Sequence, residues 1–250
     1  MNSMNRQIEV IKAPDELKPF AIIYKPWELP SAPLTVDDKD NAFCQAAEMF
    51  PQLLQVKGRK EIEHGLLHRL DTATSGLLII AATQECYDFL MTEQREGRII
   101  KTYFAECNIS ILNEKSVFPE HVEGLSSTIS TYFRPYGPGR KEVRPVPIDS
   151  NKTALNKVEK KVLYTTHITI ESIDKTKNTA LVECKISNGY RHQVRSHLAF
   201  CGLPVVNDVV YNQEVKNKKS TEQMHFCACK IQFEYPRGDL NSYDRKDTWT

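Results

Sequence analysis

The sequence has no hydrophobic run long enough to cross a membrane. Its longest apolar stretch, Leu77 to Ala82, is far shorter than the roughly 20 residues that a spanning helix needs. The first residues include Lys12, Asp15, Glu16 and Lys18 and contain no apolar stretch of the kind found in a secretory signal. These absences predict a cytoplasmic protein that does not act in a membrane.

Cysteine is present, but its spacing provides neither a disulfide framework nor a metal site. The seven cysteines are spread singly except for Cys227 and Cys229, and no Cys-x-x-Cys pair or histidine-rich tract accompanies them. This usage is typical of reduced thiols in the core of a cytosolic protein. We therefore expect no metal.

The sequence also lacks an excess of either charge, since 33 lysines and arginines face 32 acidic residues and leave a formal net charge of +1. Net charge therefore does not indicate a polyanion partner. Local clusters of positive charge could still bind phosphates. On their own they favour a solvated surface, because surface lysines are common. The clusters are 57–60, 95–101, Arg140 with Lys141 and Arg144, Arg191 with Arg195, and 216–219.

Internal repeats and low-complexity tracts are absent, and the residue pattern predicts more strands than helices. The predicted strands cover 20–24, 65–71, 76–82, 99–107, 162–173, 179–186 and 226–235, and the predicted helices cover 41–50, 84–97 and 191–200. Many neighbouring strands are separated by turns too short for crossover helices. The predicted fold class is α+β: a mixed, mostly antiparallel β-sheet core flanked by helices and loops.

Between residues 110 and 160 the pattern dissolves into prolines and glycines, with the run from Phe133 to Arg140 at its centre. This composition predicts a long loop or an insertion. No composition break sets off a second domain, so residues 1–250 are expected to form one catalytic domain.

Asp71 lies at the end of the predicted strand 65–71 and before the small polar residues Thr72 to Ser75. An exposed carboxylate at such a place can reach a substrate. It can also cap the following turn through its side chain. On this residue alone, the capping interpretation is favoured.

Two other residues could assist a carboxylate in RNA chemistry. Arg195 would hold Asp71 ionised and oriented if the fold brought them together, although it could also be an arginine on a helix surface. Four positions separate Arg191 from Arg195, so a helix would place both on one face, as it would His192 and Ser196. In the strand 99–107, Lys101 and Tyr103 share a face. Tyr103 could stack on an unpaired base or belong to the core.

Separate segments match the motifs of one known family in the same order. They are Phe20–Pro26, Gly65–Leu78, Lys101–Ala105, Gly189–Leu198 with the positions that follow it as far as Tyr211, and Met224–Pro236. The segment that contains His68, Arg69, Leu70 and Asp71 matches along its whole length. The sequence resembles the RluA-type family of pseudouridine synthases from about residue 20 to 236, interrupted by the loop region.

The resemblance implies a role for each matched site residue. Asp71 would be the nucleophile, Tyr103 would stack on the target base, and Arg195 would pair with Asp71. Arg69 would enter the RNA helix where the target base has left it. The remaining substrate contacts expected within the matched motifs are His68, Lys101, Arg191, His192, Gln193, Lys230 and Ile231.

The sequence departs from the family pattern at several positions. Trp27 and Glu28 replace a small residue and a glycine after Lys-Pro, and Asn207 stands where a glycine precedes Asp208. In addition, Tyr190-Arg191 replaces Arg-Thr, and Tyr235 replaces a common histidine. None of these changes touches Asp71, Tyr103 or Arg195, so they bear on substrate choice. With about 19 residues before the first predicted strand, we expect no N-terminal S4-type RNA-binding module.

The function implied by the resemblance is isomerisation of specific uridines to pseudouridine in structured RNA, either tRNA or rRNA, by a monomer. The reaction moves one glycosidic bond and needs no redox change, so we expect no cofactor. An RNA-binding protein that has lost catalysis is the main rival, and the presence of Asp71, Tyr103 and Arg195 together argues against it. Phosphoryl transfer is rejected, because the downstream asparagine and the glycine-rich loop of kinases are missing.

Overall fold

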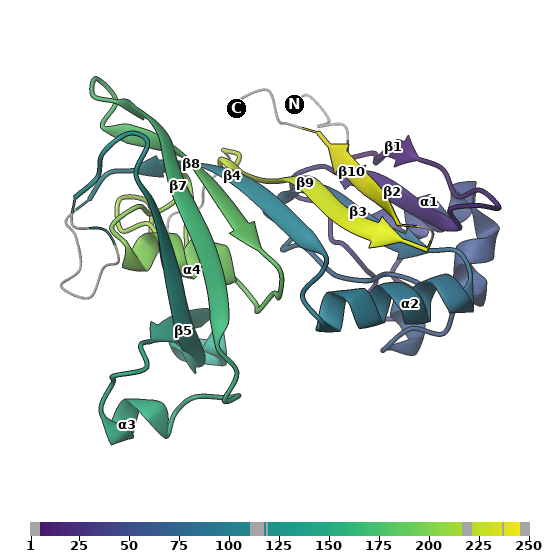
Figure 1. Cartoon of the computed structure of the whole chain (residues 1–250), viewed down its shortest axis with the longest axis horizontal. Coiled ribbons are helices and arrows are strands. Elements are labelled where there is room, and N and C mark those ends of the chain that lie inside the picture. The colour runs from purple at the N-terminus through teal and green to yellow at the C-terminus, as the bar shows by residue number, and fades with distance from the viewer. Residues whose placement is uncertain (1–5, 111–117, 119, 217–221, 237, 246–250) are drawn as a thin grey trace. The chain divides into compact units, whose positions relative to one another are not determined.

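Two compact units make up the chain (Figure 1). Unit 1 contains residues 1–101 and 227–248, and unit 2 contains residues 102–226 and 249–250. The computed structural model describes residues 6–110, 118, 120–216, 222–236 and 238–245. A single catalytic domain built from both units stays a prediction.

Unit 1 is a sheet with helices, and it contains the sequence up to the start of β4. Its strands run in the order β1, β2, β3 and β9, and β10 pairs with β9. All described pairs are antiparallel except β3 with β9, where Ser75 and Gly76 lie opposite Cys227 and Ala228 in parallel register. The elements are β1 (Glu9–Lys12), β2 (Phe20–Lys25), α1 (Ala42–Met49), the 3-10 turns η1 (Pro51–Gln55) and η2 (Glu61–Glu63), β3 (Ser75–Ala81), α2 (Gln84–Arg95), β9 (Phe226–Tyr235) and β10 (Asp239–Asp244).

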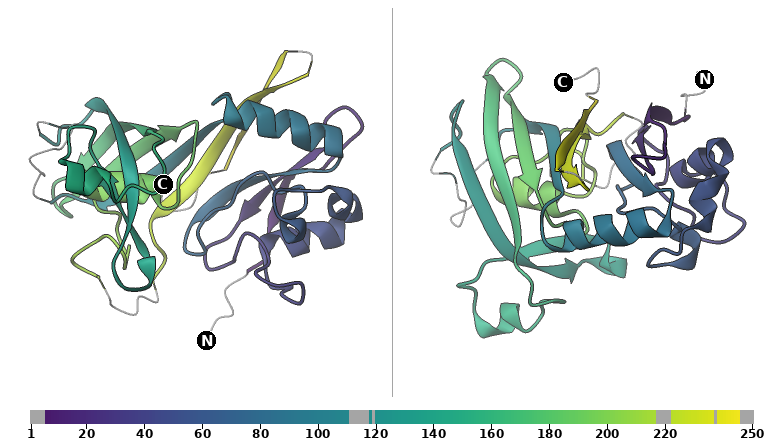
Figure 2. Two further views of the ribbon diagram at one scale, coloured as in Figure 1. Left: turned by 90° about the horizontal axis from the view of Figure 1, so that it is seen from below. Right: turned by 45° about the vertical axis from the view of Figure 1, so that its right-hand side comes forward.

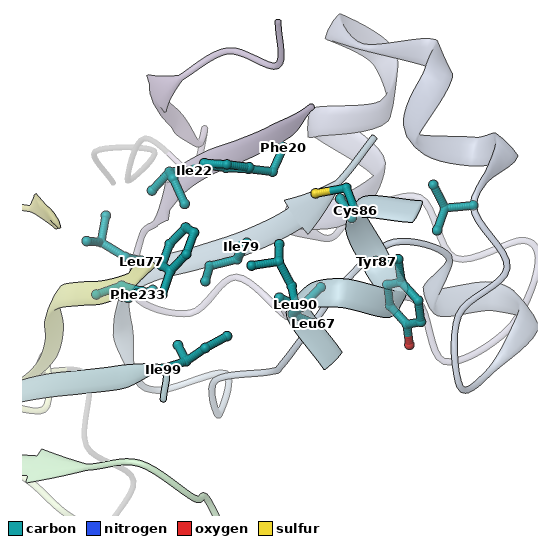
Figure 3. Packing of buried hydrophobic residues seen from close by; sticks show 13 residues of the cluster. Phe20, Ile22, Leu67, Leu77, Ile79, Cys86, Tyr87, Leu90, Ile99 and Phe233 are labelled. Carbon is teal, nitrogen blue, oxygen red and sulfur yellow. The ribbon is translucent and has the colours of Figure 1, made fainter. Parts of the chain in front are cut away.

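The core of unit 1 forms where the sheet meets α2 (Figure 3). Every residue of β3 is buried, which explains its unbroken apolar run. α2 begins at Thr83, whose hydroxyl accepts a hydrogen bond from the Cys86 amide, and ends before Gly97 at a positive φ of 75°. The cluster includes Phe20, Ile22, Leu67, Leu77, Ile79, Cys86, Tyr87, Leu90, Ile99, Ile231 and Phe233.

Unit 2 contains strands whose residues largely alternate between buried and more exposed positions, with helix α4 packed against them. Its strands run in the order β4, β8, β7, β5 and β6, and the β7–β8, β5–β7 and β5–β6 pairs are antiparallel. Helix α4 contacts β6 and β7 (Figure 2). The elements are β4 (Ile100–Asn108), β5 (Ser126–Tyr136), the 3-10 turn η3 (Pro138–Arg140), β6 (Glu142–Val146), α3 (Lys152–Leu155), β7 (Tyr164–Asp174), β8 (Thr179–Ile186) and α4 (Gln193–Phe200).

The α+β class with a mixed, mostly antiparallel sheet is confirmed. Three local predictions are wrong. Residues 65–71 form a single bridge, Leu66 to Ile80, in place of a strand. The region expected to be a loop contains β5, η3, β6 and α3, and β1 precedes the strand that was expected to be first.

The cysteines are mostly buried, and the described helices are short. All seven cysteines are free thiols, and every one except Cys44 is buried. The longest helix in the described part of the chain, α2, has 12 residues. Within that part, no helix combines the length and apolar character needed to cross a membrane.

Candidate active site

The backbone of the Asp71 segment is fixed on both sides of the carboxylate. Ser31, itself buried, donates its hydroxyl to the Leu70 carbonyl at 2.8 Å and accepts from the Leu70 amide at 2.9 Å. On the other side, the Thr72 carbonyl accepts a hydrogen bond of 3.3 Å from Lys25. The turn itself is closed by the Thr74 amide, which donates to the Asp71 carbonyl at 2.9 Å. Asp71 is therefore carried by a preorganised turn.

Lys25 is a fully buried cation. The sequence placed it only at the end of a predicted strand, within the Lys-Pro pair. Its ammonium group donates to the carbonyls of Leu29 at 2.7 Å, Pro26 at 3.0 Å and Thr72. Carbonyl dipoles offset part of the cost of burying a charge. Lys25 and Ser31 thus connect the first matched segment to the Asp71 segment. The Lys-Pro pair was the available sequence signal for this role.

Gly76 explains why the turn after Asp71 ends in glycine. Its φ is +136°, and a Cβ at this position would lie 2.5 Å from the Ala228 carbonyl oxygen of β9. Only glycine combines this backbone conformation with so close an approach. The Thr-Ser-Gly ending of the matched segment is therefore required by the pairing of β3 with β9.

A buried polar group lies beside the Asp71 segment within unit 1. Lys101 is 4% exposed and donates to the Gln94 side-chain oxygen at 3.1 Å, while Gln94 donates to the Leu67 carbonyl at 3.2 Å. Burial lowers the pKa of Lys101 to about 8. Burial, together with the charge of Lys101, also holds the pKa of His68 well below its usual value, so His68 is neutral at pH 7.

Arg69 is the exposed basic residue of the segment. Its guanidinium lies 3.2 Å from a carboxylate oxygen of Glu63, and its side chain remains 53% exposed. Lys60 contacts the same oxygen at 3.1 Å. A surface ion pair of this kind is weak enough to exchange for a phosphate or base contact.

Arg195 lies in α4, where it is 4% exposed and bound to Asp208. The Arg195 Nε is 2.8 Å from Oδ2 of Asp208, and Nη2 is 2.7 Å from Oδ1. Burial acts to raise the pKa of Asp208, but the Arg195 charge and the hydrogen bonds from Arg195, Val210 and Tyr211 outweigh it and hold the pKa below its usual value. Nη1 takes no part in the contacts with Asp208. The pairing of Arg195 with Asp71 stays a prediction.

The start of α4 differs from the sequence-based prediction. The helix begins at Gln193, because His192 adopts a left-handed conformation with φ of 55°. Arg191 therefore lies outside the helix and is exposed, so it does not share a helix face with the buried Arg195. Its guanidinium donates to the carbonyls of Arg140 at 2.6 Å and Glu142 at 3.3 Å. His192 Nδ1 lies 3.0 Å from the Tyr211 hydroxyl.

Besides Lys101, three residues expected to contact substrate lie in the interior. Gln193 is 2% exposed, and its amide group bonds to Thr165, Thr166 and the Tyr190 amide. Ile231 is 1% exposed within the core of unit 1, whereas its neighbour Lys230 is only partly buried. Tyr103 is 8% exposed, and its ring stacks on Phe226 with centroids 5.2 Å apart. Contact of Gln193, Ile231 and Tyr103 with the substrate stays a prediction.

Comparison with known proteins identifies the family. The model of the RNA pseudouridylate synthase family matches residues 19–200. The chain belongs to this family. The match includes the Asp71 segment, Tyr103 and Arg195, and the predicted RluA-type resemblance is confirmed.

Relatives and solved structures agree with this assignment. RNA pseudouridine synthase 7 of Arabidopsis thaliana is 32% identical over 168 residues, which are 65% of this chain and 38% of that protein. The tRNA pseudouridine(31) synthase of Saccharomyces cerevisiae is 30% identical over 68% of this chain and 39% of its own length. The solved human RNA pseudouridylate synthase domain containing 1 shares the fold with a TM-score of 0.69 at 18% identity, covering 98% of this chain and 85% of its own. The chain spans 38% to 48% of the first curated relatives it matches.

Proposed function

We propose that this protein isomerises uridine to pseudouridine in a structured RNA, with Asp71 as the nucleophile. The observation that carries the proposal is the fixed backbone around Asp71. Ser31 binds Leu70 on one side, and Lys25 binds Thr72 on the other. Such fixing is what a catalytic carboxylate needs, because a reacting group misplaced by 1 Å loses much of its rate.

The chemistry explains why one carboxylate and few other reactive groups suffice. The bond from ribose C1′ to uracil N1 breaks, the base rotates, and a new bond forms from C1′ to C5. The C5 proton leaves, and N1 ends protonated, so atoms and electrons balance without an oxidant. Asp71 can attack C1′, add to C6, or assist removal of a ribose proton. Each route starts from the ionised carboxylate.

The other site residues support this reaction through the RNA. Target bases must leave the helix, at a cost of a few kcal/mol that stacking and inserted groups offset. In this proposal Arg69 enters the vacated position and Tyr103 stacks on the flipped base. Arg195, oriented by Asp208, is the proposed partner of Asp71. The relatives named for tRNA or for the ribosomal large subunit make both RNAs candidate substrates.

Pseudouridine mapping across total RNA tests the proposal. Cells lacking the gene are compared with cells complemented by the wild type, by Asp71→Asn and by Asp174→Asn. Asp174 is a matched control, because it also directly precedes a turn and accepts hydrogen bonds from the amides of Thr176 and Lys177. We expect specific pseudouridines to disappear and to return with the wild type and Asp174→Asn alone.

Two results would contradict the proposal at different levels. Restoration of the sites by Asp71→Asn would remove Asp71 from the nucleophile role. An unchanged pseudouridine map in cells without the gene would refute the function. Thermal melting of the purified Asp71→Asn variant establishes that it is folded.

A further inference from the structure

The hairpin of β5 and β6 carries a basic and aromatic surface, in which Arg144 is exposed and Arg134 and Tyr136 are partly buried. Arg134 lies directly opposite Arg144 in the strand register, and Tyr136 lies two residues beyond Arg134, so the three side chains share one face. The guanidinium carbon of Arg144 is 3.2 Å from the centroid of the Tyr136 ring, and that of Arg134 is 5.1 Å from it. We name Arg134, Tyr136 and Arg144 the hairpin face.

The opposite side of the hairpin is anchored in unit 2. Phe133 and Val143 are buried and pack with Tyr164. The Val143 amide donates to the Tyr211 hydroxyl at 2.9 Å, and the Ser196 hydroxyl donates to the Val143 carbonyl at 2.9 Å. Since Ser196 belongs to α4, the hairpin is tied to the helix that carries Arg195. A ligand bound to the hairpin face would therefore be linked to α4 through the Ser196–Val143 hydrogen bond.

The arginines of the hairpin face have no acidic partner in the described part of the chain. Arg6 and Arg245, by contrast, pair with Asp40 and Glu9. Arg134 and Arg144 instead contact Tyr136. An aromatic face restrains a guanidinium but leaves its N–H groups directed at the edges, where they can bind phosphate oxygens in pairs. Their order before binding reduces the entropy lost on contact.

The local charge identifies the chemistry of the partner. Residues 132–146 carry Arg134, Arg140, Lys141 and Arg144 against Glu142 alone, although the whole chain has a net charge of only +1. Glu142 is also neutralised by Lys216, whose ammonium lies 3.0 Å away. Positive charge and an aromatic ring on one surface suit a phosphate backbone with adjacent bases.

The strand edge does not favour a protein partner that adds a strand. β6 is the last strand in the order of unit 2, and Pro145 lies within it. Proline has no amide hydrogen to donate to a further strand. The edge is therefore blocked, and the side chains of the hairpin face are what remains for recognition.

We propose that the hairpin face, which belongs to unit 2, is an RNA-docking surface that binds the phosphate backbone of the substrate and selects it. The inference rests on the proposed function for the class of ligand. It assigns part of substrate choice to Arg134, Tyr136 and Arg144. It also gives the β5–β6 hairpin a function of its own.

Binding measurements on the purified full chain test the assignment. The probes are fluorescently labelled, unmodified transcripts of tRNA and of large-subunit rRNA, titrated at several salt concentrations. The Arg134→Gln/Arg144→Gln variant should bind at least one of them about tenfold more weakly. Its slope of log affinity against log salt should fall by roughly 0.7 to 0.9 for each lost phosphate contact. Tyr136→Ala should weaken binding with a smaller change in slope, because both charges remain.

The matched control is Lys175→Gln/Lys177→Gln, which removes two exposed charges from the turn between β7 and β8. The turn between β7 and β8 follows Asp174, the last residue of β7. The β5–β6 hairpin lies toward the opposite end of β7, where β5 pairs with Tyr164 (Figure 1). We expect wild-type affinity and slope for the control. Melting temperatures establish that each variant is folded.

The outcomes separate the docking surface from the proposed function. Equal affinity and equal salt slope for wild type and Arg134→Gln/Arg144→Gln on both RNAs would overturn the docking surface, even if pseudouridine forms. Hairpin-dependent RNA binding by a wild type that forms no pseudouridine would support the docking surface and refute the proposed function. A loss of binding in the lysine control as large as in the hairpin variant would also overturn the assignment.

Discussion

Arg195 and Asp208 form a two-point ion pair in the interior of unit 2, with Nε to Oδ2 at 2.8 Å and Nη2 to Oδ1 at 2.7 Å. Their side chains are 5% and 0% exposed, so water does not solvate either charge and each charge is compensated by the other. The amides of Val210 and Tyr211 add two hydrogen bonds to Oδ1 of Asp208. This pair fixes the orientation of the arginine that the family motif assigns to the active site.

Breaking the ion pair from one side should be costly, because an unpaired charge is then left in the interior. We expect Asp208→Leu or Arg195→Met alone to lower the free energy of unfolding by about 3 to 5 kcal/mol. The double variant should lose less than the sum of the two, because neither charge remains. Urea denaturation of the four proteins measures the coupling. Additive losses would show that the two charges do not depend on each other.

The sequence predicted the fold class, most of the described strands and the helices α1, α2 and α4, because their residues alternate or recur with a clear period. It missed β5 because the exposed side of this strand is built from serine and threonine. Across the strands Ser126 bonds to Thr169, and Ser130 bonds to Thr165. Hydrogen bonds between hydroxyl groups require no hydrophobic residues, so this side of the strand shows no hydrophobic alternation in the sequence. Pro135 and Pro145 further resembled loop residues, yet they lie in a hairpin where β6 is an edge.

The candidate site was predicted through motif matching, and the structure shows where each matched side chain lies and which groups hold it. A motif match does not distinguish a side chain that contacts substrate from one that holds the fold. Gln193 and Ile231 were expected to contact RNA, and they are buried. The contacts of Lys25 and Ser31 join segments about 40 residues apart, so no local pattern could predict them. Asp208 was matched by motif, but its pairing with Arg195 required the fold.

Two departures from the family pattern occupy positions with left-handed backbone. Glu28 and Asn207 stand where the family has glycine, and their φ angles are 61° and 63°. This conformation costs an ordinary residue roughly 1 to 2 kcal/mol, whereas glycine adopts it freely and asparagine tolerates it.

Glu28→Gly should therefore stabilise the protein by about 0.5 to 1 kcal/mol, after the extra entropy of glycine in the unfolded chain is subtracted. Asn207→Gly should be close to neutral or slightly destabilising, because it also removes the hydrogen bond from Asn207 to the Gln223 carbonyl. Urea denaturation compares both with the wild type. A clear loss of stability in Glu28→Gly would show that the glutamate side chain makes a larger contribution than the strained backbone costs.

The buried Lys101 makes stability depend on alkaline pH. Burial lowers its pKa to about 8 from an ordinary value of 10.5, so the folded protein loses this proton more readily than the unfolded chain. Below pH 8 both states are protonated, and the full cost of burying the charge is present. Between pH 8 and about 10.5 the unfolded chain binds more protons, so the free energy of unfolding should rise with pH.

Lys101→Met should remove this rise, because methionine has similar length and no charge. We expect the difference in unfolding free energy between variant and wild type to change by about 3 kcal/mol from pH 8 to 10.5. Comparing the two proteins cancels the other lysines and the tyrosines, which titrate in the same range. Lys177→Met is the matched control at an exposed lysine, and its difference from wild type should stay flat. An equal pH dependence in wild type and Lys101→Met would mean that Lys101 keeps an ordinary pKa through solvent access, and its burial would then carry no electrostatic cost.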